Sequence, residues 1–337
     1  MHAPEVETCT TVSKDRDSLA VAACCDERYA MPLAVTFNSM LRSLKKGCAV
    51  FLYIVTSDIS DNARARLKNA CTVEGIDANL EFVTPDVSLV DGFHVRGYMS
   101  KAAYYRLQLP DLLPKSVDKV IYLDSDLLVQ GCLSDLWNEN IGDHSILAVE
   151  DMMIQTVSDS DGLYNWKELG YAADHPYFNS GVLVIPLNKW RREGITRRLL
   201  DYLTGDTSQF NHHDQEALNA VLGNEWGRLD LTWNSLPLYL QPDLRKWAET
   251  PFKRRLEANY RELAYKPAIC HFVSDKKPWT AGCRPPLQSE WLSTLRMSGW
   301  FTQSEFSSWH RDWLCRHYTL GVRNKINAIT GKRFATL

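Results

Sequence analysis

The chain has 337 residues, of which 45% are hydrophobic and 23% charged, enough for a large globular core. Its formal net charge of −3 gives no overall field that would attract nucleic acid or an acidic membrane. Residues 1–18 are polar and charged, and no apolar run approaches the roughly 18 residues that a membrane span needs, so we expect neither a signal peptide nor a transmembrane helix. Nine cysteines without a Cys-x-x-Cys pair are typical of reduced thiols in a cytoplasmic enzyme.

The first 90 residues alternate apolar runs with helical patterns. Residues 18–25, 50–55 and 80–83 are apolar runs of strand length. Between the first two, apolar residues recur at spacings of three and four from Leu33 to Leu44, which predicts a helix that Gly47 ends. Another helix is expected over 60–72. Because strand and helix alternate, the pattern predicts a parallel sheet covered by helices.

The same alternation continues through the middle of the chain. The predicted elements are a helix over 100–107, strands over 120–123 and 145–149, a mobile polar loop or insertion over 152–174, a strand over 177–185 and a helix over 188–203. Residues 212–216 open a further helix, which places polar side chains at its positive end. A short strand is expected near 269–273, followed by a loop.

Two carboxylates follow the apolar run at 120–123. Side chains alternate along an extended chain, so Asp124 and Asp126 leave it on the same face. A hard divalent cation would relieve their repulsion, and the carboxyl end of a strand in an α/β sheet is where phosphorylated ligands bind. Because Asp-x-Asp is also typical of a solvated turn, other residues have to decide. A neutral His271 could complete the coordination of such a cation, and Lys277 could reach phosphates.

Six separated motifs carry a resemblance to a known family. They are Asp26-x-x-Tyr29, Tyr105-Arg106-Leu107, Tyr122-Leu123-Asp124-Ser125-Asp126, Phe178-Asn179-Ser180-Gly181-Val182, Asp214-Gln215, and His271 with Lys277-Pro278-Trp279. In this order they resemble the family 8 glycosyltransferases, which include bacterial lipooligosaccharide galactosyl- and glucosyltransferases, glycogenin and galactinol synthase. The resemblance runs from about residue 18 to 280. Each motif alone is weak, whereas the ordered set is specific.

The resemblance implies a fold, a reaction and a cofactor. The fold would be GT-A, a Rossmann-like and mostly parallel sheet covered by helices, with a small C-terminal helical segment. The reaction would transfer glucose or galactose from UDP-glucose or UDP-galactose to a hydroxyl of a glycan, glycolipid or small molecule, with retention of anomeric configuration. Oxygen ligands with one imidazole suit Mn²⁺, with Mg²⁺ as a substitute. A cation bridging the two phosphates would stabilise the departing UDP.

The resemblance also assigns roles to residues. Asp124, Asp126 and His271 would hold the metal. The donor site would comprise Asp26, Tyr29, Arg106, Asp124, Ser125, Asp126, Asn179, Ser180, Asp214, Gln215, His271, Ser274 and Lys277. The catalytic residues would be Gln215, Asp214, Arg106 and Asp151, with Gln215 as a weak nucleophile or charge stabiliser. Asp26 would bind uracil and Lys277 the diphosphate.

Two positions depart from the family pattern, and the Asp-x-Asp motif has alternative interpretations. Ser274 stands where the family usually has glycine, and Arg28 where an amide-bearing residue often precedes the tyrosine. A haloacid-dehalogenase-like phosphatase also uses Asp-x-Asp, but that family expects Thr or Val at the place of Leu128 and the motif near the start of the core. A non-catalytic sugar-nucleotide binder and a glycogenin-like primer that glucosylates its own tyrosine are further alternatives. A hexose mass on the purified protein would reveal the primer.

We expect three regions: a flexible N-terminus over 1–17, a catalytic domain over 18–283 and a helical, basic C-terminal segment over 284–337. Thr302 and Glu305 form a capping-box pattern that begins a helix. Phe306, Trp309 and Trp313 share one face of that helix, and such a stripe is more typical of core packing than of a membrane surface.

The basic tail at residues 316–337 has five Lys and Arg residues and no acid. It would allow peripheral contact with an anionic membrane, and we therefore expect a cytoplasmic enzyme with such contact at the inner face. Because the predicted donor residues precede 280, ending the chain after about residue 301 should leave donor hydrolysis intact, provided that Trp309 and Trp313 are not core residues.

Overall fold

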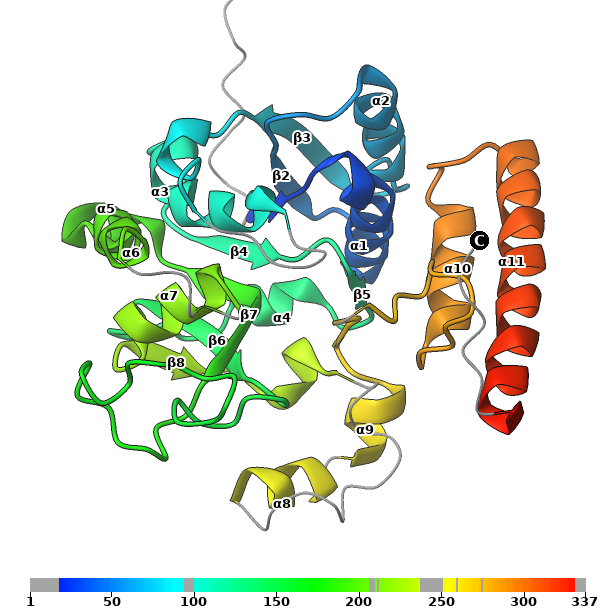
Figure 1. The fold of residues 1–337 in the computed structure, drawn as a ribbon. Coiled ribbons are helices and arrows are strands. Elements are labelled where there is room, and N and C mark those ends of the chain that lie inside the picture. The colour runs from blue at the N-terminus through cyan, green and yellow to red at the C-terminus, as the bar shows by residue number, and fades with distance from the viewer. Residues whose placement is uncertain are drawn as a thin grey trace, which may run out of the picture.

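In the part of the chain that the structure describes, seven strands form the central sheet in the order β3-β2-β1-β4-β7-β6-β8 (Figure 1). β1 to β4 run parallel, β7 runs antiparallel to both of its neighbours, and β8 is parallel to β6. The predicted mostly parallel α/β sheet is therefore confirmed. The strands are Leu19–Cys24 (β1), Ala49–Val55 (β2), Asp77–Val83 (β3), Val120–Leu123 (β4), Ile146–Glu150 (β6), Phe178–Ile185 (β7) and Trp226–Arg228 (β8), and a second small sheet pairs Leu127–Val129 (β5) with Ile269–His271 (β9).

This computed structural model describes residues 18–93, 100–205, 210, 212–236, 251–258, 260–273 and 275–330. The expected flexible N-terminus at 1–17, Ser274 and the end of the basic tail at 331–337 lie outside the described residues. The helices are Ala30–Ser43 (α1), Asp61–Ala70 (α2), Leu109–Leu112 (α3), Leu133–Trp137 (α4), Leu187–Glu193 (α5), Ile195–Leu203 (α6), Asp214–Leu222 (α7), Pro251–Ala258 (α8), Tyr260–Tyr265 (α9), Gln288–Met297 (α10) and Gln303–Thr330 (α11). None of the helices searched within this part of the chain is long and apolar enough to cross a membrane.

Both faces of the sheet are covered, and β1 shows how the sequence achieves this. Its side chains alternate, so Leu19 and Val21 pack with α1 and α2 on one face. Ala20 and Ala22 pack on the other face with the 3₁₀ helix Lys101–Gln108 and with α5, α6 and α7. A strand buried on both faces must be apolar throughout, which is why its sequence is a continuous apolar run.

Three sequence predictions need correction or refinement. The helix predicted over 188–203 is two helices, because Gly194 takes a left-handed conformation with φ of 61° and ends α5. The segment 152–174 is a loop, as predicted, but it is anchored where a mobile insertion was expected. Val157 and Leu163 are buried in a cluster that also contains Tyr171, whose hydroxyl donates to the carbonyl of Ala220 on α7 at 3.0 Å. The helix predicted over 100–107 is a 3₁₀ helix.

The C-terminal helices pack against the sheet domain. α10 lies against α1, and α11 is outermost, beside α10 (Figure 1). The predicted capping box forms, since Thr302 N–H donates to Glu305 Oε2 at 2.8 Å and Glu305 N–H donates to Thr302 Oγ1 at 3.3 Å. Phe306 and Trp309 pack against the cluster that contains Trp291 and Leu295 of α10.

Trp313 completes this packing and decides how α11 is attached. It is only 4% exposed, and its Nε1–H donates to the carbonyl of Trp279 at 3.0 Å. The aromatic stripe is therefore core packing. Donor hydrolysis was expected to survive truncation after residue 301 only if Trp309 and Trp313 were not core residues. Since Trp313 is a core residue, that expectation no longer holds.

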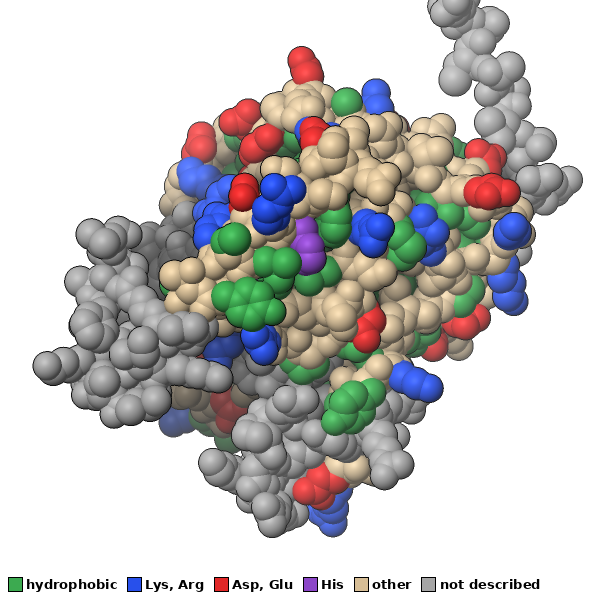
Figure 2. Space-filling view, turned by 90° about the vertical axis from the view of Figure 1, so that its right-hand side faces the viewer, with side chains coloured by type: hydrophobic (Ala, Val, Ile, Leu, Met, Phe, Trp, Pro, Cys, Tyr) green, Lys and Arg blue, Asp and Glu red, His purple; other side chains and the backbone are tan. Residues whose placement is uncertain are grey.

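The outer side of α11 is mixed in character. In Figure 2, which looks onto this side, hydrophobic side chains lie between Lys and Arg side chains. A hollow of about 580 Å³ lies there, lined by Arg296 of α10 and by Phe306, His310 and Arg311 of α11 among others. It contains none of the residues predicted to bind the donor.

Candidate active site

A cleft of about 330 Å³ opens at the carboxyl ends of β1, β4 and β6. It lies where the strand order turns from β1 toward β2 on one side and toward β4 on the other, which is the place where open α/β sheets bind ligands. Every predicted site residue that the structure describes lines this cleft. They are Asp26, Tyr29, Arg106, Asp124, Ser125, Asp126, Asp151, Asn179, Ser180, Asp214, Gln215, His271 and Lys277.

The reversal of β7 brings Asn179 and Ser180 into the cleft. Because β7 is antiparallel to β4, with Leu123 paired to Val182, its first residues lie beside the last residues of β4. Asn179 and Ser180 therefore reach the cleft from the start of a strand, whereas Asp124 reaches it from the end of one. The motif indicated these residues, but the sequence pattern gave no strand direction.

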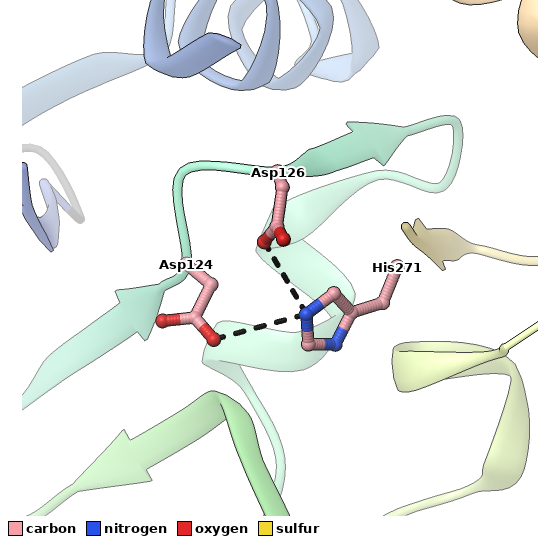
Figure 3. Close-up of side chains that lie close together, drawn as sticks. All are labelled: Asp124, Asp126 and His271. Carbon is pink, nitrogen blue, oxygen red and sulfur yellow. Dashed lines mark ion pairs between the residues drawn. The ribbon is translucent and has the colours of Figure 1, made fainter. Parts of the chain in front are cut away.

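Asp124, Asp126 and His271 form a compact group (Figure 3). One ligand atom from each residue lies within 4.8 Å of the others. His271 Nε2 is 3.3 Å from Asp126 Oδ1 and 3.8 Å from Asp124 Oδ2. The antiparallel pairing of β5 with β9 creates this group, because Leu127 lies opposite His271 in the register.

The orientation of the His271 ring is set by Asn234, a residue that the sequence did not single out. His271 Nδ1 lies 2.9 Å from Asn234 Oδ1, and Asn234 Nδ2 donates to Asn179 Oδ1 at 2.8 Å. Since Asn234 offers its carbonyl oxygen, Nδ1 must carry the proton, and a neutral imidazole then turns the lone pair of Nε2 toward the two carboxylates. Three electron-pair donors facing one another fit a divalent cation, and a ligand histidine held through its other nitrogen is typical of metal sites.

Gly181 provides the space that the His271 ring needs. A Cβ at Gly181 would overlap the ring, at 2.7 Å from Nδ1, and would lie 3.0 Å from Asp124 Oδ2. Such contacts are tighter than atoms tolerate, so a side chain here would displace both the histidine and the first carboxylate. This explains physically why the Asn179-Ser180-Gly181 motif ends in glycine.

Arg106 is buried behind Asp124. Its NH2 donates to Asp124 Oδ1 at 2.9 Å and its NH1 donates to the carbonyl of Ser180 at 2.7 Å. Tyr122 also donates to Asp124 Oδ1, at 2.8 Å, and the guanidinium lies 4.3 Å from the centre of the Tyr122 ring. With Oδ1 engaged on this side, Oδ2 is the oxygen that faces His271.

Asp214 is a second carboxylate that forms an ion pair with Arg106. Its Oδ2 lies 3.0 Å from Arg106 Nε, but that N–H donates to the carbonyl of Ala103 at 3.0 Å, so the contact is an ion pair without an aligned hydrogen bond. Burial raises the pKa of Asp214 to about 6, although Arg106 opposes the rise. Asp214 therefore holds its proton more tightly than an exposed aspartate does.

Asp124, Asp126 and His271 are called the metal group below. Lys277 contacts this group at Asp126, whereas Arg106 contacts it at Asp124. The Nζ of Lys277 is 2.5 Å from Asp126 Oδ2 and 2.5 Å from the carbonyl of Phe272. Burial alone would raise the pKa of Asp126, but the facing Lys277 ammonium is the main influence that opposes it, and the pKa lies well below its usual range. Asp126 is therefore a carboxylate throughout the physiological pH range.

A chain of hydrogen bonds fixes Gln215. Its Oε1 accepts from Ser180 N–H at 2.9 Å, and its Nε2 donates to Asp151 Oδ2 at 3.2 Å. Asp151 Oδ2 also accepts from Asn179 Nδ2 at 2.8 Å. The other oxygen, Oδ1, accepts from the backbone N–H groups of Met153 and Ile154 at 2.7 and 3.1 Å. Asp151 thus holds both amide side chains and the start of the 152–174 loop.

The remaining predicted residues lie toward β1. Asp26 Oδ1 accepts from Tyr29 N–H at 3.1 Å and caps the short helix that leads into α1. Ser125 is buried, and its hydroxyl donates to the carbonyl of Cys24 at 3.0 Å. These contacts tie the Asp-x-Asp turn to the end of β1.

A comparison with protein families decides the family of this chain. The glycosyl transferase family 8 profile matches residues 20–283. The chain belongs to this family. General stress protein A of Bacillus subtilis is 30% identical over 285 residues, which cover 84% of this chain and 94% of that protein. Glycosyltransferase GlyF of Streptococcus pneumoniae is 28% identical over 277 residues, which cover 82% of this chain and 60% of GlyF.

Solved structures agree on the fold of this glycosyltransferase. The crystal structure of the galactosyltransferase LgtC in complex with donor and acceptor sugar analogs matches with a TM-score of 0.69 at 23% identity. The match covers 83% of this chain and 96% of LgtC. The predicted GT-A fold and the resemblance to family 8 are both confirmed, and the phosphatase alternative is excluded by the family.

The Arg106 contacts lead to a stability prediction. Arg106→Leu should lower the free energy of unfolding by about 3–5 kcal/mol, because it leaves buried Asp214 and the carboxylate of Asp124 without their shared counter-charge. Urea unfolding at pH 7 would measure this. Arg197→Leu is the matched control, since the ion pair of Arg197 with Asp201 is largely exposed and should contribute little. An unfolding midpoint that is the same for both variants would contradict the role given to Arg106.

Proposed function

We propose that this family 8 enzyme transfers glucose or galactose from UDP-glucose or UDP-galactose to a hydroxyl of a glycan, a glycolipid or a small molecule. The observation that carries the proposal is the group of Asp124, Asp126 and His271 in the cleft, with the Nε2 lone pair turned toward both carboxylates. Two carboxylates and one imidazole suit Mn²⁺, with Mg²⁺ as a substitute. When bound, the metal would offset the charge of the UDP diphosphate as it departs.

The chain's own cations would assist at the phosphate end of the donor. Lys277 lies beside Asp126, so its ammonium is within reach of a diphosphate that shares the same cation. Arg106 serves the site through Asp124 and the carbonyl of Ser180, which it holds in place. In this proposal Lys277 binds the donor, and Arg106 keeps the first carboxylate oriented while facing the sugar pocket.

Gln215 and Asp214 would face the sugar. Because Ser180 N–H and Asp151 fix the two ends of the Gln215 amide, the side chain is held before any substrate arrives. A preorganised dipole beside the carbon where positive charge develops stabilises that charge without reorganisation. We assign Gln215 as the group nearest this carbon, Asp214 as its charged neighbour, and Asp151 and Asn179 as the residues that hold them.

The base and the acceptor would occupy the two ends of the cleft. Asp26 and Tyr29, at the end of β1, are proposed to contact uracil. Met153 and Asp161 belong to the 152–174 loop and line the cleft beyond Asp151, where an acceptor hydroxyl could enter. We propose 18–283 as the catalytic domain, with 284–337 as a C-terminal segment packed against it.

Attachment to a membrane through the basic tail stays a prediction, as does the cytoplasmic location. The prediction rests on Arg316, which is exposed, and on the acid-free sequence that follows it. Co-sedimentation with anionic vesicles that falls as salt rises would support it, and no co-sedimentation at low salt would exclude it.

The metal proposal predicts the outcome of two changes. Excess EDTA should abolish UDP release from UDP-glucose and UDP-galactose, and Mn²⁺ should restore it better than Mg²⁺. Asp126→Asn should lower turnover by about a hundredfold or more, because it removes a negative charge that binds the cation. Asp111→Asn, at an exposed acid on α3, is the matched control and should retain the wild-type rate. Full turnover in EDTA, or in Asp126→Asn, would count against the metal site.

The stereochemical proposal has its own test. Transfer from the α-linked donor should give an α-linked product. The reason is that the resemblance to family 8 implies retention, with Gln215 held beside the reacting carbon. Proton NMR of the first-formed product reports the anomeric configuration through its coupling constant. A β-linked first product would contradict retention without affecting the metal proposal.

A further inference from the structure

The loop at residues 275–284 connects the metal histidine's strand to α10 and carries Lys277. It contains no helix or strand of its own within the described residues, yet Lys277 is only 5% exposed. Turn hydrogen bonds from Lys277 N–H to Asp275 and from Thr280 N–H to Lys277 shape the loop locally. Such a loop keeps one position only if other elements hold it.

α11 holds this loop from the outside. Trp313 donates from Nε1–H to the carbonyl of Trp279 at 3.0 Å. One turn later, His317 lies between two donors of the loop, with Gly282 N–H 3.1 Å from Nδ1 and Arg284 Nε 3.0 Å from Nε2. A neutral imidazole accepts at only one of these nitrogens, so at most one of the two contacts is a hydrogen bond at a time.

Gly282 shows how closely helix and loop approach. It adopts a φ of +85°, and a Cβ there would lie 3.1 Å from the Cβ of Leu320 on α11. Any side chain at this position would therefore be strained in its backbone and crowded against the helix. The loop and α11 are fitted to each other over two turns of the helix.

Trp279 connects α11 to the donor cleft. Its ring stands edge-on to Tyr29 with a centroid distance of 6.0 Å, and it packs on Trp291 of α10 at 5.2 Å. Tyr29 lines the cleft and donates its N–H to Asp26. Lys277 precedes Trp279 by two residues and contacts Asp126. Two cleft residues are thus connected to Trp279, Tyr29 through its ring and Lys277 through the chain.

We propose that α11 is a positioning element of the donor site, in which Trp313 holds Trp279 and thereby keeps Lys277 and Tyr29 in their binding positions. This rests on the proposed donor site. Trp313 touches no cleft residue in the contacts above, so it acts through the loop and is a positioning residue. The helix would serve binding of the nucleotide more than the chemical step, since Lys277 and Tyr29 lie at the phosphate and base ends of the cleft.

Trp313→Ala tests the proposal, with Trp309→Ala as the matched control. Trp309 is the same residue type one turn earlier on the same helix face. Its ring packs on Phe301 and Phe306 and stacks on Trp313 at 6.4 Å, but it makes no hydrogen bond to Trp279 among the described contacts. Calorimetry of UDP binding with Mn²⁺ should give a dissociation constant raised about ten- to a hundredfold in Trp313→Ala, and the KM for the UDP-sugar should rise more than kcat falls. Trp309→Ala should stay within about twofold of wild type, because Trp313 keeps its hydrogen bond to the carbonyl of Trp279.

A second readout does not depend on the donor chemistry. Cys283 lies in the loop and is half-buried, whereas Cys315 lies exposed on α11. In Trp313→Ala, alkylation of Cys283 relative to Cys315 should accelerate, as followed by peptide mass spectrometry, whereas in Trp309→Ala the ratio should match wild type.

If Trp313→Ala does not fold, Trp313→Phe decides, because it keeps an aromatic ring and loses the Nε1–H. Its dissociation constant should then rise about two- to tenfold.

The outcomes separate the two proposals. If wild-type protein fails to bind UDP with Mn²⁺, the proposed function is wrong, and the Cys283 ratio alone judges whether α11 positions the loop. If wild type binds UDP and the deciding Trp313 variant binds it equally well with an unchanged Cys283 ratio, the role of α11 is wrong while the donor site stands. Equal losses in Trp309→Ala would also overturn it, since they would reflect general destabilisation.

Discussion

Two backbone N–H groups at the start of β7 set the direction of the hydrogen bonds in the cleft. Gly181 N–H donates to Asn179 Oδ1, which also accepts from Asn234, so the Asn234 carbonyl oxygen must face His271. Ser180 N–H donates to the Gln215 oxygen, so its amide nitrogen must face Asp151. Because a backbone N–H can only donate, the orientation of both amides and the tautomer of the histidine follow from it. The residues proposed to hold the metal and those proposed to face the sugar thus belong to two branches of one network.

Charge balance is the second constraint on the cleft. Asp126 and Asp214 are buried and Asp124 is partly buried, and a buried carboxylate without a counter-charge is unfavourable. Arg106 lies between Asp124 and Asp214, and Lys277 faces Asp126. The Lys277 side of the balance depends on a loop that α11 holds, so the C-terminal helix belongs to the same electrostatic arrangement. This is a physical reason for aromatic packing so far from the cleft in sequence.

The sequence predicted much of this fold, and its failures have local causes. Apolar runs identified the strands from β1 to β7 other than β5, because strands buried on both faces have continuous apolar sequences. The more exposed strand β3, Asp77–Val83, was recognised only over residues 80–83. The direction of β7 was beyond reach, since no residue in it encodes direction. Gly194 was overlooked inside a helical pattern that continued on both sides. Among site residues the motifs led to the right cleft, whereas Asn234 was missed because an asparagine in a short 3₁₀ helix, Leu231–Asn234, has no motif of its own. The aromatic face of α11 was read correctly as core packing, but its contact with Trp279 required tertiary structure.

The central claim is that Asn234 presents His271 Nε2, together with Asp124 and Asp126, to a divalent cation. The most direct test is the Mn²⁺ dissociation constant, measured by calorimetry on wild type, Asn234→Ala and Asn234→Asp at matched thermal stability. We predict that Asn234→Ala binds Mn²⁺ about 10–100-fold more weakly, and that Asn234→Asp recovers part of the affinity because it keeps an acceptor for the Nδ1 proton but loses the N–H donated to Asn179. Unchanged Mn²⁺ affinity in Asn234→Ala would contradict the account.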